Sequence, residues 1–185
     1  MKGTARPVHW TYEDYLLFPE DGKRYEIVEG EKLVTPAPLP KHQTVLANLI
    51  RLLVQFLEGK DLGKWFPSPI DVVFAQESVV QPDLIFIRKD RLQIIGERAI
   101  TGAPDLVVEV VSASSRKLDS ITKRKLYAGY GVNEYWIVDP ELERIEILVL
   151  EGGSLVKKVE HVEGDAWSLE VLPGFSTALR EVFAD

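Results

Sequence analysis

Two acidic residues lie in segments whose other residues are almost all apolar. Asp83 lies within "VVQPDLIFI" and Glu109 within "DLVVEVVS". Short apolar runs of this kind predict strands buried on both faces, where an ionised carboxylate is costly unless something compensates it. Side chains alternate along a strand, so two neighbouring strands could bring both acids side by side on one face. Close like charges favour a cation between them, and the pair therefore predicts a Mg²⁺ site that could also take Mn²⁺.

A strand carboxylate also has an ordinary structural explanation. Taken singly, Asp83 or Glu109 is more often paired with an arginine or placed at a sheet edge. Pro82 supports an edge or a bulge beside Asp83, because proline cannot donate a ladder hydrogen bond. The metal site becomes the better interpretation only when the two acids are considered together with the helix that follows Glu109.

Lys123 lies in the first turns of that helix, within "DSITKRKLY". A lysine near two carboxylates and a metal could hold a phosphate group or position the attacking water. The alternative is a surface ion pair, because Asp119 lies four residues earlier. Spacing alone does not decide between these two roles.

The elements needed to position these residues follow an α/β (α+β) order with a mixed sheet. Apolar residues at helical spacing predict a helix over 41–59, and Asp119 or Ser120 could cap a second helix that ends at Gly129 or Gly131. Strands are expected at 70–75, 78–87, 105–112 and 134–139. Further elements are expected towards the two ends: a Thr11-capped helix over 11–18, β-hairpins over 24–35 and 144–162, and a short helix within 172–183.

Composition sets broad limits on the class of protein. The 185 residues fit one domain over 1–185, with 45% hydrophobic and 28% charged residues. There is no cysteine, so disulfides and thiolate metal sites are excluded. No apolar run is long enough to span a membrane, and the first residues lack a signal-peptide pattern, so a cytoplasmic location is expected. The net charge of −7 argues against non-specific nucleic-acid binding by the whole surface, but permits a local basic strip.

Several stretches together resemble a known family. "QPDLIFI", "GAPDLVVEVVS" and "DSITKRKLYAGYGVNEYWIVDP" are similar to a large bacterial family of "putative restriction endonucleases" within the PD-(D/E)XK nuclease superfamily. The similarity extends upstream through "RYEIVEGEKLV" and "KHQTVLANLIRLL" and downstream to "LPGF", and so covers nearly the whole chain. It implies a restriction-endonuclease-like αβββαβ core and Mg²⁺-dependent hydrolysis of phosphodiester bonds in DNA.

The resemblance also implies roles for individual residues. Asp83 matches the motif's aspartate and Glu109 its second acid, whereas Val111 stands where the superfamily has its lysine. Lys123 matches the displaced lysine of this family, carried on the following helix. Glu26 and His42 are candidate accessory residues, with a surface hairpin residue and a polar helix start as their ordinary explanations. Basic residues near these strands could contact the DNA backbone: Arg88, Lys89, Arg91, Arg116, Lys117, Arg124 and Lys125.

Other chemistries have less support. The three histidines, His9, His42 and His161, lack the HExxH spacing of a zinc protease, and neither a GxSxG motif nor a P-loop is present. Paired carboxylates could serve a glycosidase, but nothing else points to sugar. The prediction is therefore a DNA endonuclease, with a homodimer expected by analogy for double-strand cuts. Its rivals are a catalytically inactive nucleic-acid-binding protein on the same fold and an interaction module.

Overall fold

The computed structural model describes residues 8–113, 115–161, 166–168 and 171–184. A six-stranded sheet runs through the middle of the molecule in the order β11-β10-β9-β8-β6-β3. Only β8 and β9 pair in parallel; the other neighbours are antiparallel. Its strands are β3 (Gly63–Pro67), β6 (Leu84–Arg88), β8 (Leu106–Val110), β9 (Glu134–Asp139), β10 (Arg144–Glu151) and β11 (Ser154–His161).

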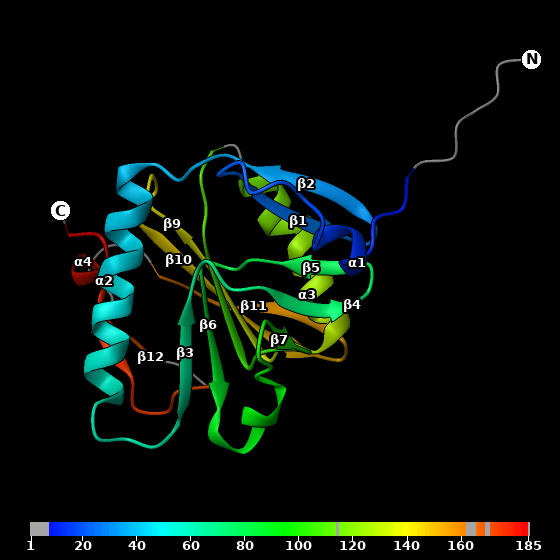
Figure 1. Cartoon of the computed structure of the whole chain (residues 1–185). Helices are drawn as coiled ribbons and strands as arrows, with labels where there is room; N and C mark the ends of the chain where they lie inside the picture. The colour runs from blue at the N-terminus through cyan, green and yellow to red at the C-terminus, as the bar shows by residue number, and fades with distance from the viewer. Residues whose placement is uncertain (1–7, 114, 162–165, 169–170, 185) are drawn as a thin grey trace, which may run out of the picture.

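One face of this sheet is covered by the long helix α2 (Pro40–Leu57), as Figure 1 shows. Pro40 occupies the first turn, and the buried residues Val45, Leu49 and Leu53 recur at helical spacing. They pack in one core with side chains from alternate positions of β6 and β8. The short helix α4 (Leu179–Val182) packs against α2, and β12 (Ala166–Ser168) pairs with β13 (Ser176–Ala178).

The other face is covered by helix α3 (Arg124–Tyr130) and a second sheet, ordered β2-β1-β5-β4-β7. Side chains of α3, the second sheet and the opposite face of β6 and β8 form the second core. The elements of this layer are α1 (Tyr12–Tyr15), β1 (Arg24–Val28), β2 (Glu31–Thr35), β4 (Val72–Ala75), β5 (Ser78–Val80), β7 (Ile100–Thr101), and the π-helical segment Leu118–Lys123 that leads into α3. A 3₁₀ helix, Lys89–Ile94, follows β6.

The restriction-endonuclease-like fold predicted from the sequence is confirmed, including the αβββαβ order of the core and both hairpins. The expected helices are also present. Thr11 caps α1 in a capping box with Asp14, and Gly131 ends α3 in the left-handed conformation. The β1–β2 turn has positive φ at Glu29 and Gly30, as a tight hairpin requires.

Two details of the prediction are wrong. The segment 78–87 is two strands in different sheets, because the chain leaves the ladder at Pro82. The first strand of the αβββαβ core is β3, which was not among the expected strands, whereas the expected strand over 70–75 belongs to the second sheet. No helix within the described ranges is long and apolar enough to cross a membrane.

Candidate active site

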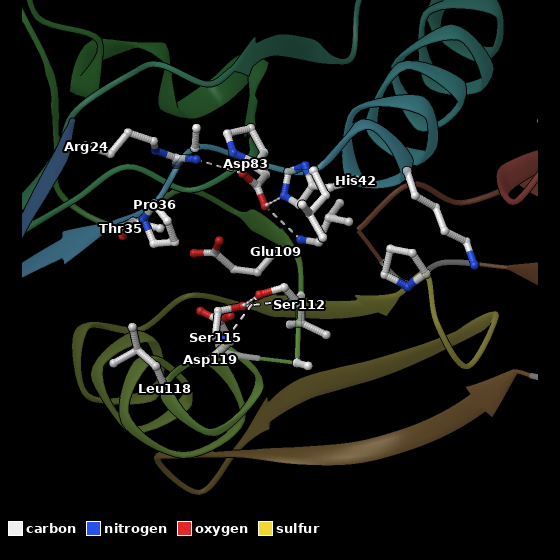
Figure 2. A pocket seen from close by; sticks show the side chains of 18 of the residues that line it. Arg24, Thr35, Pro36, His42, Asp83, Glu109, Ser112, Ser115, Leu118 and Asp119 are labelled. Carbon is white, nitrogen blue, oxygen red and sulfur yellow. Dashed lines mark hydrogen bonds and ion pairs between the residues drawn. The ribbon is translucent and has the colours of Figure 1, made fainter. Parts of the chain in front are cut away.

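A cavity of about 420 Å³ lies between the two sheets, at the end where β8 runs into the π-helical segment. The first hairpin, the start of α2 and the chain after β9 complete its walls, and Figure 2 shows it from close by. Acidic, basic and apolar side chains all line it: Arg24, Glu26, 35–39, Lys41, His42, Asp83, 109–113, Ser115, Leu118, Asp119, Lys123, Pro140 and Glu141.

Asp83 stands immediately before β6, where the chain has crossed from the second sheet into the first. The β6–β8 register pairs Leu84 with Val108, so Asp83 lies beside the Glu109–Val110 end of β8. Its Oδ2 accepts the backbone N–H of Val110 at 2.8 Å. The Asp83 side chain is 4% exposed, and the strand break at Pro82 positions it.

Two further groups hold the Asp83 carboxylate. Arg24 Nη1 lies 3.2 Å from Oδ1, and His42 Nε2 lies 3.1 Å from Oδ2 (Figure 2). Burial would raise the pKa of Asp83, but the hydrogen bond from His42, the positive charge on His42 and Arg24, and the Val110 N–H together bring it below its usual value. Asp83 is therefore ionised at neutral pH.

Glu109 lies on the same side of the sheet but has different partners. Its Oε1 accepts the Lys123 ammonium at 3.0 Å and the Tyr127 hydroxyl at 2.6 Å. Lys123 also lies 3.0 Å from Oε1 of Glu26 and 3.7 Å from Oδ1 of Asp119. One buried ammonium thus joins three carboxylates that come from β1, β8 and the π-helical segment.

Burial dominates the protonation of this cluster. It raises the pKa of Glu109 to about 8, because desolvation and the nearby Asp119, Asp83 and Glu26 charges outweigh the attraction of Lys123. It also raises the pKa of Asp119, again against Lys123. For Lys123, burial alone would lower the pKa, but the surrounding carboxylates raise it. Lys123 therefore stays charged while Glu109 holds its proton near neutral pH.

The charge balance of the cavity depends on whether Glu109 is protonated. With Glu109 ionised, four buried acids, Glu26, Asp83, Glu109 and Asp119, face Arg24, Lys123 and His42, the last of which is charged only when protonated. Oε2 of Glu26 is buried and has no hydrogen-bond partner among the described residues. The surplus of negative charge that appears when Glu109 loses its proton, and the unpartnered oxygen of Glu26, suit an added cation.

The donor set suits Mg²⁺ or Mn²⁺ better than zinc. Within the described residues no three His, Cys, Asp or Glu side chains form a ready metal-binding cluster. A cation bound here would use two carboxylates, Asp83 and Glu109, and would complete its coordination with water or substrate oxygen. Mg²⁺ is commonly bound in this way, whereas zinc prefers nitrogen and sulfur ligands.

Comparisons with known proteins agree with this fold. The sequence profile of the Uma2 family, described as "Putative restriction endonuclease", matches residues 12–180. The chain belongs to this family. The crystal structure of a "putative nuclease belonging to DUF820" from Anabaena variabilis is similar, with a TM-score of 0.76 and 16% sequence identity over 94% of this chain and 97% of that one. None of the curated proteins compared with the chain matches it.

The cavity of this Uma2 member contains all five residues singled out for chemistry: Glu26, His42, Asp83, Glu109 and Lys123. For two of these residues, the alternative of an ordinary surface position is wrong. Glu26 is not a surface hairpin residue, because β1 lies between β2 and β5 and the side chain is 1% exposed. Lys123 is not in a surface pair, because it and its Asp119 partner are both buried.

The helix start was also predicted wrongly. Helical residues begin at Arg116, so Asp119 does not cap the helix but lies inside its first turns, in the π-helical segment. Two residues of the site were missed: Arg24, which lines the cavity, and Tyr127, which does not line it but donates a hydrogen bond to Glu109. Arg24 precedes Glu26 by two positions on β1, so strand alternation could have placed it on the same face. Tyr127 follows Lys123 by four residues, a helical neighbour of the predicted lysine.

The basic residues proposed for DNA contacts do not gather around the cavity. Arg88, Lys89 and Arg91 lie at the far end of β6 from Asp83, about 16 Å away along the strand. Arg88 and Arg91 pair there with the buried Asp105, and Lys89 pairs with Asp61.

The remaining four lie along the helical stretch that ends in α3. Arg116 follows cavity residue Ser115 directly and pairs with Asp139 at 2.7 Å, with the exposed Lys117 beside it. Arg124 donates to the backbone carbonyl of Leu155. Together with Lys125 it lines a separate groove beside the β10–β11 turn. Arg116 and Lys117 are therefore the basic candidates nearest the acids.

Proposed function

We propose that this protein is a Mg²⁺-dependent endonuclease that hydrolyses phosphodiester bonds in DNA. The observation that carries the proposal is the meeting of Asp83, Glu109 and Lys123 in one cavity, from three elements distant in sequence. Buried ionisable groups with perturbed pKa values in a cavity are typical of functional sites. Membership of a family described as restriction endonucleases favours nucleic acid as the substrate.

Asp83 and Glu109 would hold the metal, with Mn²⁺ as an alternative to Mg²⁺. When bound, the metal would lower the pKa of a water molecule, polarise the phosphate and stabilise the leaving oxygen. Asp83 is already ionised, whereas Glu109 has to lose its proton to act as a ligand. Lys123 assists this loss, because its charge lies 3.0 Å from Glu109 Oε1.

Lys123 would also orient the attacking water, as a displaced equivalent of the superfamily lysine. The strand position two residues after Glu109 is Val111, which is buried and cannot supply a charge. Glu26 is fixed by Lys123 and by the Gln81 N–H at 2.8 Å, with Oε2 left available to accept a proton from that water. His42 would steady Asp83 from the opposite side.

A catalytically inactive DNA-binding protein is the second candidate. The observation in its favour is that Arg24, His42 and the Val110 N–H already engage both Asp83 oxygens. An acid held in this way can have a purely structural role. The two candidates differ in whether Asp83 also ligates a metal.

Cleavage of plasmid and linear DNA, with Mg²⁺ or Mn²⁺ and with EDTA, tests the proposal. Wild type should cut only with metal, and Asp83→Asn and Glu109→Gln should not cut. Glu146→Gln is the control, because Glu146 is an ion-paired strand acid outside the cavity, 3.0 Å from Arg144. DNA binding without cleavage in any metal would favour the inactive protein. Absence of DNA binding would favour an interaction module. Double-strand cuts by a species of twice the chain mass would support a homodimer.

A further inference from the structure

Arg24 is the cavity cation whose hydrogen-bonding capacity is least satisfied. Nη1 contacts Asp83 at 3.2 Å and Nη2 donates to the backbone carbonyl of Gln81. Nε is buried and has no partner among the described residues. Since a guanidinium carries five N–H donors in a planar fork, Arg24 has donors to spare within the cavity.

The two lysines of the cavity are less able to bind a substrate, because one is already paired with buried acids and the other lies at the rim. Lys123 is surrounded by Glu26, Glu109 and Asp119. The Lys41 side chain is 44% exposed at the rim and lies 4.0 Å from Glu141. Arg24, in contrast, is 22% exposed and faces the acid proposed as a metal ligand, as Figure 2 shows.

Asp83 Oδ2 accepts hydrogen bonds from His42 and the Val110 N–H, whereas Oδ1 accepts, among the described residues, only the one from Arg24. A cation that ligates Oδ1 would therefore lie beside the Arg24 guanidinium and be repelled by its charge. The Val110 N–H is fixed by the sheet, so the two side chains that can move are Arg24 and His42. A guanidinium displaced from Asp83 remains anchored through Nη2 to Gln81. It would then need a new anion in the same cavity.

We propose that Arg24 binds the phosphate of the substrate once Asp83 is engaged by a metal, and is held by Asp83 until then. Guanidinium and phosphate match as bidentate partners, and such charge-assisted pairs are stronger than neutral hydrogen bonds. This inference rests on the proposed nuclease function and assigns its substrate-binding group. Arg24 is therefore both a partner of Asp83 in the free protein and a substrate ligand in the complex.

DNA affinity of Arg24→Gln tests the assignment. A labelled DNA duplex is titrated by fluorescence anisotropy in Ca²⁺, which also takes oxygen ligands and separates binding from hydrolysis. Arg24→Gln should bind DNA about tenfold more weakly or worse, because one charge-assisted contact is lost. The slope of log affinity against log salt should fall by about one, as expected when one phosphate contact disappears. Arg144→Gln is the control, since Arg144 is 27% exposed and paired with acids outside the cavity.

Metal affinity provides the second readout. Arg24→Gln should bind Mg²⁺ at least as tightly as wild type, because the guanidinium no longer competes for Asp83. Loss of Mg²⁺ binding would overturn the inference, since Arg24 would then only be positioning Asp83. If Arg24→Gln does not fold, Arg24→Lys replaces it. Weaker DNA binding by Arg24→Lys supports a bidentate contact between the Arg24 guanidinium and the phosphate. DNA binding by Arg24→Lys with wild-type affinity overturns that contact.

Failure of this inference differs from failure of the proposed function. A wild type that cuts DNA, together with an Arg24→Gln variant that binds DNA as wild type does, overturns only the role of Arg24. A wild type that binds DNA with metal but never cuts it overturns hydrolysis, and the affinity and salt slope of the variant still decide the role of Arg24. A wild type that binds no DNA overturns both.

Discussion

Replacing Lys123 by methionine should strongly destabilise the fold. Methionine keeps most of the side-chain volume but leaves Glu26, Glu109 and Asp119 without their shared cation. Lys123 and Glu109 side chains are each 5% exposed, so solvent cannot substitute for the lost charge. Breaking a buried ion pair by removing one partner costs about 3–5 kcal/mol. For a chain of this size the melting temperature should fall by about 6–20 °C.

The cost should depend on pH in a defined direction. Burial already raises the pKa of Glu109 and Asp119 against the attraction of Lys123, so without Lys123 these two acids retain protons to higher pH in the folded state than in the unfolded state. Stability should therefore fall as pH rises, and the variant should be closer to wild type at pH 5 than at pH 8. This dependence separates charge imbalance from a simple packing defect, which would be insensitive to pH.

Thermal and urea unfolding of metal-free protein at pH 5 and pH 8 measures both effects. Lys125→Met is the matched control, because Lys125 lies two residues further along the same helical stretch and is exposed. It should change stability by less than about 0.5 kcal/mol. Equal, small changes in the two variants would refute the buried four-residue cluster and restore a surface role for Lys123.

Three further predictions concern the buried polar groups. Because the pKa of Glu109 is raised from 4.5 to about 8, its contribution to metal-free stability should be full below pH 4.5 and lost as pH rises through 8. Urea unfolding from pH 5 to 9 should therefore find Glu109→Gln more stable than wild type only at the alkaline end. Asp105→Asn should cost about 3–5 kcal/mol, since Asp105 is fully buried against Arg91 and Arg88, but should leave Mg²⁺ affinity unchanged in the folded protein; loss of that affinity would place Asp105 in the site. Tyr127→Phe should lose about 1–3 kcal/mol, because the 2.6 Å hydrogen bond to buried Glu109 disappears, and an unchanged urea midpoint would contradict that bond.

The order of elements and the meeting of the two acids could be predicted from local patterns. Strand alternation placed Asp83 and Glu109 on one face, and the antiparallel β6–β8 register has that consequence. Helical spacing was sufficient to predict α2, because Pro40 marks its start and the apolar residues recur along one face. These features depend on residues close together in sequence, or on the neighbouring strand.

Features that depend on a distant partner were not predictable in the same way. Glu26 is buried because β1 pairs with β5, some 50 residues later, and the alternating hairpin pattern cannot show which face is covered. Strand β3, "GKWFP", is short, lies at the sheet edge and is bounded by glycine and proline, so its pattern resembles a loop. The two Pro-Asp dipeptides look alike in sequence, yet Asp83 lines the cavity while Asp105 pairs with Arg91 at the other end of the sheet.

The central claim is that the buried acids of the cavity form a metal site, and calorimetric titration with Mg²⁺ and Mn²⁺ tests it most directly. Wild type should bind the metal, Asp83→Asn and Glu109→Gln should lose binding while remaining folded, and Glu146→Gln should bind as wild type does. Binding of equal affinity in wild type and Asp83→Asn, or no binding by wild type at any pH from 7 to 9, would contradict the claim.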